Sequence, residues 1–422
     1  MNEPAVRIIP VLFAFLLAIS PVSAQDEEAA PDAAPAASAP TAPSPDVAKA
    51  MREKSLEILI SMQEGPEKSE WPYEGVYAWG DRTRPGVKII PLGYRAGGTS
   101  IAALQLLETP GYAADRRRHE PVHRAARAVL ALLDEDLMSP GFAGDYDVRG
   151  WGHAYALLFF LRLREAGGLD EALDAQLAKA NRRLVLALQE MAIPENGGWN
   201  YSLRRGFGNP RNAASPFMTG PTLQALFLAK RAGLPVETRV VDEALAALER
   251  GRTESGGYSY SSSPRPRALA GKDEEALGMM DKKPGSSGRM CVVEATLALA
   301  GRGDVARIRD AVETFFAHHD ALKVRKQQNG THIPPYGVAP YYFMYAHYYC
   351  AQAIEQLPAE ERAAWRARLA ATLVAEQEPD GGWNDRVFPR SRNYGTAMGL
   401  GALVMAEMTP PARWIPDAKK DD

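Results

Sequence analysis

A turn of two glycines and an aromatic residue recurs three times along the chain, and repetition on this scale constrains the fold more than any single residue can. The copies are Gly197-Gly198-Trp199, Gly256-Gly257-Tyr258 and Gly381-Gly382-Trp383, and they stand many tens of residues apart. Each follows an amphipathic stretch and leads toward a more apolar one. The chain is therefore predicted to repeat one unit, made of a helix, a glycine-rich turn and a second helix.

The two helices of a unit differ in the faces that they bury. Residues 170–190 place Leu177 and Leu184 on one helical face, with charged residues between the apolar ones and Asp170 as the expected N-cap. Residues 221–232 are apolar on nearly all sides and begin with Pro221, a residue suited to the first turn of a helix. The first kind of helix is expected on the outside of the protein and the second kind inside it.

The same alternation can be read six times. Outer helices are predicted at residues 46–63, 119–136, 170–190, 236–251, 303–320 and 358–377, and inner helices at 99–108, 152–166, 221–232, 290–300, 341–356 and 393–408. Two concentric rings satisfy both kinds of helix, which predicts an all-α protein, an (α/α)6 toroid over residues 46–410. The alternative is an open superhelix, which needs polar terminal repeats. The strongly apolar last helix favours closure.

The ends of the chain are predicted to lie outside the toroid. Arg7, the apolar stretch 8–19 and the small residues at 22–24 follow the order of a signal peptide, which predicts removal of residues 1–24 and a periplasmic or secreted protein. The apolar stretch is shorter than the roughly 20 residues of a membrane-spanning helix, so no stable membrane span is expected afterwards. Residues 25–45, rich in Ala and Pro, are predicted to be a disordered spacer, and residues 411–422 a tail.

Charge and cysteine content limit the partners. The net charge is -3, with basic and acidic residues mixed, so no nucleic acid is expected as a partner and a small-molecule or protein ligand fits better. Cys291 and Cys350 are the only cysteines. They can form a disulfide after export if their Cα atoms lie within about 7 Å, a distance that the sequence leaves open.

The turns at Trp199 and Trp383 each follow a helix that ends near a glutamine, Gln189 or Gln377, and they resemble the QW-type repeats of the squalene-hopene cyclase and protein prenyltransferase superfamily. The resemblance covers most of the chain from about residue 46. Residues 342–357 also resemble the late inner helix of exported single-toroid proteins that carry these repeats and mostly lack an assigned activity. Membership would imply a central cavity near the amino-terminal ends of the inner helices, where unsatisfied N–H groups favour an anionic or electron-rich group.

The catalytic sets of that superfamily are both missing. Cyclases of the squalene-hopene type protonate an alkene with an Asp-x-Asp-Asp cluster, and the nearest approach here, Asp145-Tyr146-Asp147, is interpreted as a turn. Prenyltransferases hold zinc with an Asp, a Cys two residues later and a His. Cys291 and His347 match the order of the last two ligands, but Arg289 occupies the Asp position. Neither activity is expected, and no metal or other cofactor is predicted.

Aromatic residues and two histidines near the starts of inner helices are the candidate ligand contacts. The alternative for each is structural, with aromatic rings filling space between the rings of helices and histidines bonding to nearby carbonyls. Trp199, Tyr258 and Trp383 are interpreted as structural, because an aromatic residue after two glycines can pack on an adjacent helix. The cavity-binding candidates are Trp151, His153, Tyr155, Glu294, His332, Tyr336, Tyr345, His347, Tyr348, Asp385 and Tyr394.

Three functions fit these residues. The first is a toroid without catalysis that binds a small-molecule or protein ligand through its cavity or rim. The second is an enzyme in which His153, His347 and tyrosines act on an isoprenoid or a polysaccharide. Cleavage of a polysaccharide by hydrolysis would need two carboxylates within about 10 Å across a cleft, from Asp145, Asp147, Glu294 and Asp385. The third is a structural scaffold. Residues 262–289 are interpreted as a loop, either over one mouth of the ring or as a solvated insertion.

Overall fold

The computed structural model describes residues 42–73, 79–80, 88–141, 148–200, 212–261, 279–326, 336–337, 342–386 and 388–416. Residues 1–41, which hold the predicted signal peptide and most of the predicted spacer, lie outside the described residues. Thirteen α-helices are found in the described part of the chain. None of these helices is both long enough and apolar enough to cross a bilayer.

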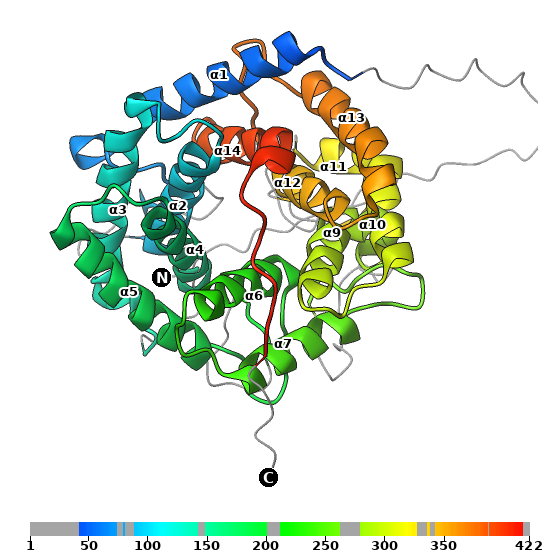
Figure 1. Ribbon diagram of the computed structural model, residues 1–422. Coiled ribbons are helices and arrows are strands. Elements are labelled where there is room, and N and C mark those ends of the chain that lie inside the picture. Colours follow the sequence, from blue (N-terminus) through cyan, green and yellow to red (C-terminus); the bar gives the residue numbers. More distant parts are fainter. Residues whose placement is uncertain are drawn as a thin grey trace, which may run out of the picture. The chain divides into compact units, whose positions relative to one another are not determined.

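Outer and inner helices alternate along the chain (Figure 1). The outer helices are α1 (Pro45–Ser61), α3 (His119–Leu133), α5 (Glu171–Glu190), α7 (Thr238–Arg250), α10 (Val305–Ala317) and α13 (Ala359–Ala375). The inner helices are α2 (Leu92–Glu108), α4 (Arg149–Ala166), α6 (Pro216–Arg231), α9 (Lys283–Leu299), α12 (Tyr342–Ile354) and α14 (Ser391–Val404). A short helix, α11 (His319–Lys326), follows α10. This arrangement is the predicted (α/α)6 toroid.

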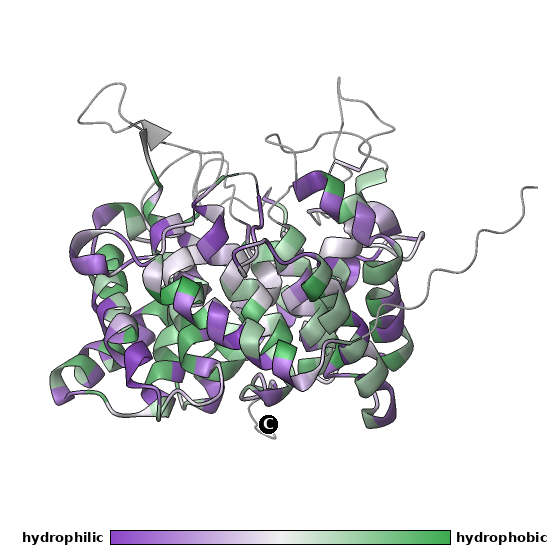
Figure 2. Ribbon diagram, turned by 90° about the horizontal axis from the view of Figure 1, so that it is seen from above, coloured by the Kyte–Doolittle hydropathy of each residue, from purple (hydrophilic) through white to green (hydrophobic). Residues whose placement is uncertain are grey.

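The inner helices form a closed ring. Each inner helix contacts the next one in the chain, and α14 contacts α2, so the last inner helix meets the first. This contact excludes the open superhelix. Residues 216–229 of α6 are all buried, as expected for an inner helix, whereas α5 buries Leu177 and Leu184 and leaves Leu186 60% exposed. Figure 2 shows the ring from its side, with hydrophilic residues frequent on the outer helices.

Three of the six outer helices are each joined by a tryptophan to the inner helix that follows. The indole N–H of Trp199 donates to the carbonyl of Leu188 in α5 at 2.7 Å, and its backbone N–H donates to the Thr219 hydroxyl in α6 at 3.0 Å. Trp383 makes the same pair of bonds with Leu373 and Thr396, and Trp71 makes it with Leu59 and Thr99. The structural interpretation of Trp199 and Trp383 is confirmed, and Trp71 is a third member that the sequence did not reveal.

Several inner helices begin earlier than predicted. Helix α6 starts at Pro216, which occupies the first turn, so Pro221 lies inside the helix rather than at its start. A proline there has no N–H to give to the carbonyl four residues earlier. The freed carbonyl of Phe217 instead accepts a hydrogen bond from the Tyr345 hydroxyl of α12 at 3.2 Å. Helix α9 likewise starts at Lys283, inside the stretch predicted to be a loop.

Two small features lie outside the predicted pattern. Strands β1 (Trp79–Gly80) and β2 (Lys88–Ile89) pair antiparallel between α1 and α2. After α14 the chain forms a 3-10 helix, η4 (Met405–Glu407), and then runs without regular structure to residue 416. Figure 1 shows this last part, in red, crossing the middle of the ring toward α6 and α7.

Candidate functional site

Aromatic side chains meet at the amino-terminal ends of the inner helices, in what we call the aromatic cluster. Tyr94 and Trp151 stand in the first turns of α2 and α4, and Tyr394 stands in the first turn of α14. The ring of Tyr73, from the turn before α2, lies 4.7 Å from that of Tyr394 and 5.9 Å from that of Trp151, centroid to centroid. All members are buried. The cluster consists of Tyr73, Tyr94, Trp151, Tyr155, Tyr345, Tyr349 and Tyr394.

The cluster continues deeper into the ring through the second turns of α4 and α12. The rings of Trp151 and Tyr155 are 5.4 Å apart, and the hydroxyls of Tyr155 and Tyr349 are 3.3 Å apart. Tyr349 in turn packs on Tyr345 at 4.4 Å. Burial raises the pKa of each of these tyrosines, so their phenols stay protonated and can donate hydrogen bonds.

Asp385 places a carboxyl group against this cluster. One oxygen, Oδ1, accepts the backbone N–H of Met344 in the first turn of α12 at 2.9 Å, and Oδ2 accepts the Tyr73 hydroxyl at 3.1 Å. Burial raises the pKa of Asp385 to about 6, against the lowering effects of the Met344 N–H, the Arg386 charge and the Tyr73 hydroxyl. The group therefore titrates close to neutral pH, as a general acid must.

Two polar atoms of the cluster have no hydrogen-bond partner among the described residues. They are Nε1 of Trp151 and the hydroxyl oxygen of Tyr394, and their side chains are 3% and 1% exposed. A buried polar atom without a partner costs about 1–3 kcal/mol. The cluster therefore contains unused donors as well as a titrating acid.

Both predicted histidines lie between the two rings of helices rather than on the interior wall. Nε2 of His347 lies 3.0 Å from Nε2 of His319 in α11, and its Nδ1 lies 2.8 Å from the carbonyl oxygen of Phe343. The ring of Phe315, in the outer helix α10, packs on the same imidazole at 5.0 Å. His153 is buried near the carbonyls of Arg149 and Met138 and near the charge of Arg183 in α5. Burial lowers the pKa of both histidines, that of His153 to about 3, so both are neutral at pH 7.

Glu294 also faces the outer ring. Its carboxylate accepts the Tyr258 hydroxyl and lies 3.3 Å from the Arg307 guanidinium of α10. The interaction links the turn between α7 and α9 to its inner helix, where three of the other turns use a tryptophan. Tyr336 is partly buried against the core, and His332 lies outside the described residues. Asp145 and Asp147 also lie outside them.

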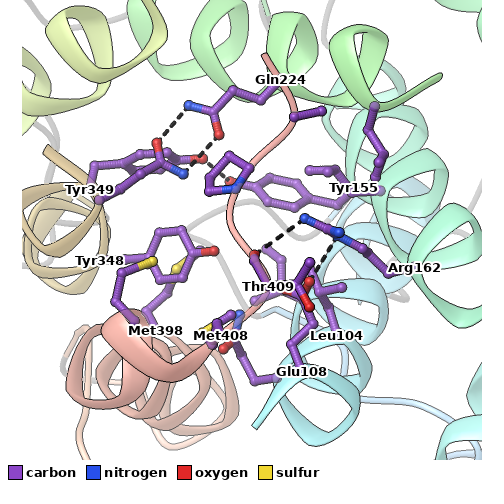
Figure 3. A pocket seen from close by; sticks show the side chains of 18 residues that line it. Leu104, Glu108, Tyr155, Arg162, Gln224, Tyr348, Tyr349, Met398, Met408 and Thr409 are labelled. Carbon is purple, nitrogen blue, oxygen red and sulfur yellow. Dashed lines mark hydrogen bonds and ion pairs between the residues drawn. The ribbon is translucent and has the colours of Figure 1, made fainter. Parts of the chain in front are cut away.

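A pocket, which we call the interior pocket, opens at the other end of the ring (Figure 3). It is lined by the second halves of the inner helices and by the chain after α14, and its enclosed cavity measures about 40 Å³. Tyr155 and Tyr349 belong both to this pocket and to the aromatic cluster. The lining residues are Ile101, Leu104, Gln105, Glu108, Tyr155, Leu158, Arg162, Gln224, Leu228, Tyr348, Tyr349, Gln352, Met398, Met405, Met408, Thr409, Pro411 and Ala412.

The polar groups of the interior pocket bond mainly to one another. The amides of Gln224 and Gln352 exchange two hydrogen bonds, at 2.7 and 3.0 Å. The guanidinium of Arg162 pairs with the carboxylate of Glu108 at 2.9 Å. Burial raises the pKa of Glu108 to about 7, with the Arg162 charge acting in the opposite direction. Apart from Gln105 and Thr409, the remaining wall is aromatic, aliphatic or methionine.

The structure brings six of the sequence candidates together and places His153, Glu294 and His347 toward the outer ring. Trp151, Tyr155, Tyr345 and Tyr394 belong to the aromatic cluster, Asp385 bonds to it, and Tyr348 lines the interior pocket. Sequence reasoning missed Tyr73, because no repeat signal marks the turn before α2. It also missed Glu108 and Arg162, which read as ordinary charges at the ends of helices.

The two cysteines lie on adjacent inner helices as free thiols. Cys291 in α9 and Cys350 in α12 are both buried. Burial raises the pKa of Cys350, and contact with the Cys291 thiol raises it further. The Cys350 thiol is therefore protonated at neutral pH and weak as a metal ligand or nucleophile.

No protein-family model and no curated protein matches the sequence. Among solved structures, the unsaturated glucuronyl hydrolase from Bacillus sp. GL1 is similar, with a TM-score of 0.55 and 14% identity over 88% of this chain and 100% of that one. The α-1,6-mannanase GH76A from Salegentibacter sp. HEL1_6 has a TM-score of 0.50 and 11% identity over 85% and 98%. The type II terpene cyclase MstE from Scytonema has a TM-score of 0.47 and 14% identity over 86% and 99%. At these identities the likeness to the first two establishes the fold alone, and the chain shares the α/α toroid fold with them.

Proposed function

We propose that the protein binds a small molecule inside its ring and that the interior pocket is the binding site. The observation that carries this proposal is a pocket in the interior of the closed ring, with walls that are aromatic, aliphatic or methionine over most of their length. Such walls surrounding a few polar groups are the usual composition of a ligand site. The terpene cyclase and glycoside hydrolase neighbours have the same architecture, and their names record ligands of two different classes.

The proposed ligand is a flexible, mostly apolar molecule of the isoprenoid type with one hydrogen-bonding end. Three methionines in the wall, Met398, Met405 and Met408, adapt to irregular apolar shapes. Gln224 and Gln352 both line the pocket and are hydrogen-bonded to each other. Either amide can give up that hydrogen bond and form one with a hydroxyl group of the ligand instead. A wholly polar ligand would meet few partners on the remaining wall.

Catalysis by the two mechanisms of the resembled superfamily is not part of this proposal. The sequence lacks the Asp-x-Asp-Asp cluster, and Arg289 stands where the zinc-binding Asp would be. The buried Arg289 guanidinium donates hydrogen bonds to the carbonyls of Tyr258 and Met280. Its role is therefore structural, in the turn between α7 and α9.

The experiment is a calorimetric titration of the purified protein with farnesol, geranylgeraniol and mannobiose. Leu158→Trp places a larger side chain on the pocket wall, and Leu186→Trp makes the same change on the exposed outside of α5. Binding of an isoprenoid alcohol that L158W abolishes and L186W retains supports the proposal. Equal binding to all three proteins, or no binding of either alcohol, contradicts it.

A second candidate, an enzyme, rests on Asp385. Its carboxyl group is buried against aromatic rings, bonds to the Tyr73 hydroxyl and has a pKa raised to about 6 by burial. A carboxyl group with a raised pKa can protonate a glycosidic oxygen, the chemistry of one of the two substrate classes considered. Product formation from an isoprenoid or oligosaccharide substrate that Asp385→Asn abolishes and Asp281→Asn retains would favour this candidate over binding alone.

The proposed location is outside the cytoplasm, after removal of residues 1–24. The support is the order of charged, apolar and small residues at the amino terminus. Amino-terminal sequencing of the protein recovered from the periplasm or medium tests this. The expected mature chain begins at Gln25, and recovery of the chain from the cytoplasm with Met1 or Asn2 in place contradicts export.

A further inference from the structure

The chain after α14 forms one wall of the interior pocket. Met405, Met408, Thr409, Pro411 and Ala412 all line it. The segment crosses the middle of the ring, from α14 toward α6 (Figure 1). Any ligand entering from this end must pass the segment. We call residues 405–414 the strap.

Arg162 holds the middle of the strap. Its Nη2 donates to the carbonyl oxygen of Pro410 at 2.9 Å and to that of Thr409 at 3.4 Å (Figure 3). Pro410 and Pro411 have no N–H groups, so this part of the strap can be held only through its carbonyls. A guanidinium group, which donates several hydrogen bonds and accepts none, suits that task.

Arg162 is itself oriented by two carboxylates. Its Nε lies 2.9 Å from Glu108 of α2, and its Nη1 lies 2.9 Å from Glu165 one turn further along α4. Glu165 also pairs with Arg231 at the end of α6 at 2.7 Å. The guanidinium is buried, with the side chain 7% exposed, so its bonds are worth more than those of a surface pair.

The strap has few polar anchors, and its buried side chains are Met405, Met408, Ala412 and Trp414. Near its start Glu407 pairs with Arg52 of α1 at 2.5 Å. At its far end the backbone N–H of Trp414 donates to the Leu299 carbonyl at 2.9 Å, and the Trp414 ring packs on the Phe227 ring at a centroid distance of 5.6 Å. Between these points the backbone has no regular structure. A segment with few backbone hydrogen bonds opens at lower free energy than the helices beneath it.

We propose that the strap is a gate over the interior pocket and that Arg162 is its latch. Breaking the bonds from Arg162 to the carbonyls of residues 409 and 410 frees the middle of the strap and opens the pocket at this end. Arg162 acts through the strap and is a positioning residue. The gate gives the proposed ligand site an entrance, so the inference rests on that function, but its test needs no ligand.

The test combines hydrogen exchange with methionine oxidation in Arg162→Gln and in the matched control Arg231→Gln. Arg231 belongs to the same ion-pair network through Glu165 and makes no bond to the strap that the structure records. Hydrogen peroxide oxidises exposed methionines, so oxidation of Met398 on the pocket wall reports entry. Met290 in α9, equally buried and not among the residues that line the pocket, serves as the internal reference.

Loss of a hydrogen bond from a charged group, worth about 1.5–3 kcal/mol, predicts an increase of about tenfold or more in Met398 oxidation and in exchange of the Met408 and Trp414 amides, the strap amides with a recorded backbone hydrogen bond, in R162Q. R231Q should behave like the unmodified protein. Trp414→Ala, which frees the far anchor, should give the same local pattern. Unchanged exchange of the strap in R162Q overturns the proposal. So does faster exchange spread evenly over α2, α4 and α6, or strap release without faster Met398 oxidation. A failure to bind farnesol bears on the proposed function and not on these readouts.

Discussion

The hydroxyl of Tyr73 donates to Oδ2 of Asp385 at 3.1 Å, which links the turn before α2 to the turn before α14. These turns belong to the first and last helical hairpins. The amide of Asn393 strengthens the same junction by donating to the Pro72 carbonyl at 3.0 Å. The ring is therefore closed by polar bonds as well as by the packing of α14 against α2.

Tyr73→Phe removes the hydroxyl and leaves Asp385 Oδ2 without that donor. The expected loss in free energy of unfolding is about 1–2 kcal/mol, because a buried acceptor loses its partner while the aromatic ring remains. Urea unfolding followed by circular dichroism measures it. Tyr112→Phe, at a partly buried tyrosine outside the junction, is the control. Equal small losses in the two variants would mean that the Tyr73 bond contributes little to closure.

The pKa of Asp385 predicts a pH dependence of stability with a defined sign. Burial raises this pKa from its usual 3.8 to about 6. The contribution of the Asp385 carboxyl group to the free energy of unfolding is therefore present below pH 4 and is lost as the pH rises through 6. Asp385→Asn removes this loss. The stability of D385N relative to the unmodified protein should therefore increase by about 1 kcal/mol between pH 5 and pH 8. A constant difference across this range contradicts the raised pKa.

The pKa of His153 predicts a pH dependence of stability with the opposite sign. Burial lowers its pKa from 6.5 to about 3, so its contribution is present above pH 6.5 and is lost as the pH falls below that value. At pH 5 the neutral folded imidazole costs about 2 kcal/mol relative to the protonated unfolded one. His153→Gln should therefore reduce the drop in free energy of unfolding between pH 7.5 and pH 5 by that amount. An unchanged drop would show that His153 is solvated in the folded protein.

The turn tryptophans predict a shared loss of stability. Trp71→Phe, Trp199→Phe and Trp383→Phe each leave a buried leucine carbonyl without its indole donor, which costs about 1–3 kcal/mol. Trp365→Phe, at a partly buried position on the outer helix α13, should cost less. Thermal unfolding of the four variants measures the effect. A W71F protein that resembles W365F would exclude Trp71 from the repeat.

The fold could be predicted because its repeat appears as local patterns of charged and apolar residues in the sequence. Each predicted outer helix matches a helix of the structure to within a few residues, since charged and apolar residues alternate along it. Inner helices were predicted too short at their starts. Gly97, Gly98, Gly285 and Gly288 are typical of loops in the sequence, yet they lie in the first two turns of α2 and α9. An added Cβ at Gly98 would come within 2.5 Å of the Trp71 carbonyl oxygen, so close packing and not flexibility explains this glycine.

The site could be predicted in part, because the aromatic residues near the starts of inner helices were correctly placed together. The histidines were assigned to the wrong face. In α12 the residues Tyr345, Tyr348, Tyr349 and Gln352 follow the spacing of one helical face, and the last three line the interior pocket. His347 falls on another face of the helix. This periodicity was present in the sequence, but nothing in the sequence says which face of a helix buried on all sides points inward.

The contacts at the carboxyl-terminal end of the ring could not be predicted. Arg162 and Glu108 are separated from the strap carbonyls by about 250 and 300 residues of chain, and no repeat or motif marks them. The sequence of a tail after the last helix does not indicate whether that tail is free or crosses the ring. Only the closed arrangement of α2, α4 and α14 brings these groups together.

Photoaffinity labelling with a diazirine analogue of farnesol tests the central claim most directly, because it reports where an apolar ligand lies. Peptide mapping after irradiation should place the label within residues 101–108, 155–162, 348–352 and 398–412, the segments that hold most of the interior pocket's wall. Unlabelled farnesol should compete for it, and L158W should lose it while L186W keeps it. Label confined to the outer helices, or label that farnesol does not displace, would contradict a ligand site inside the ring.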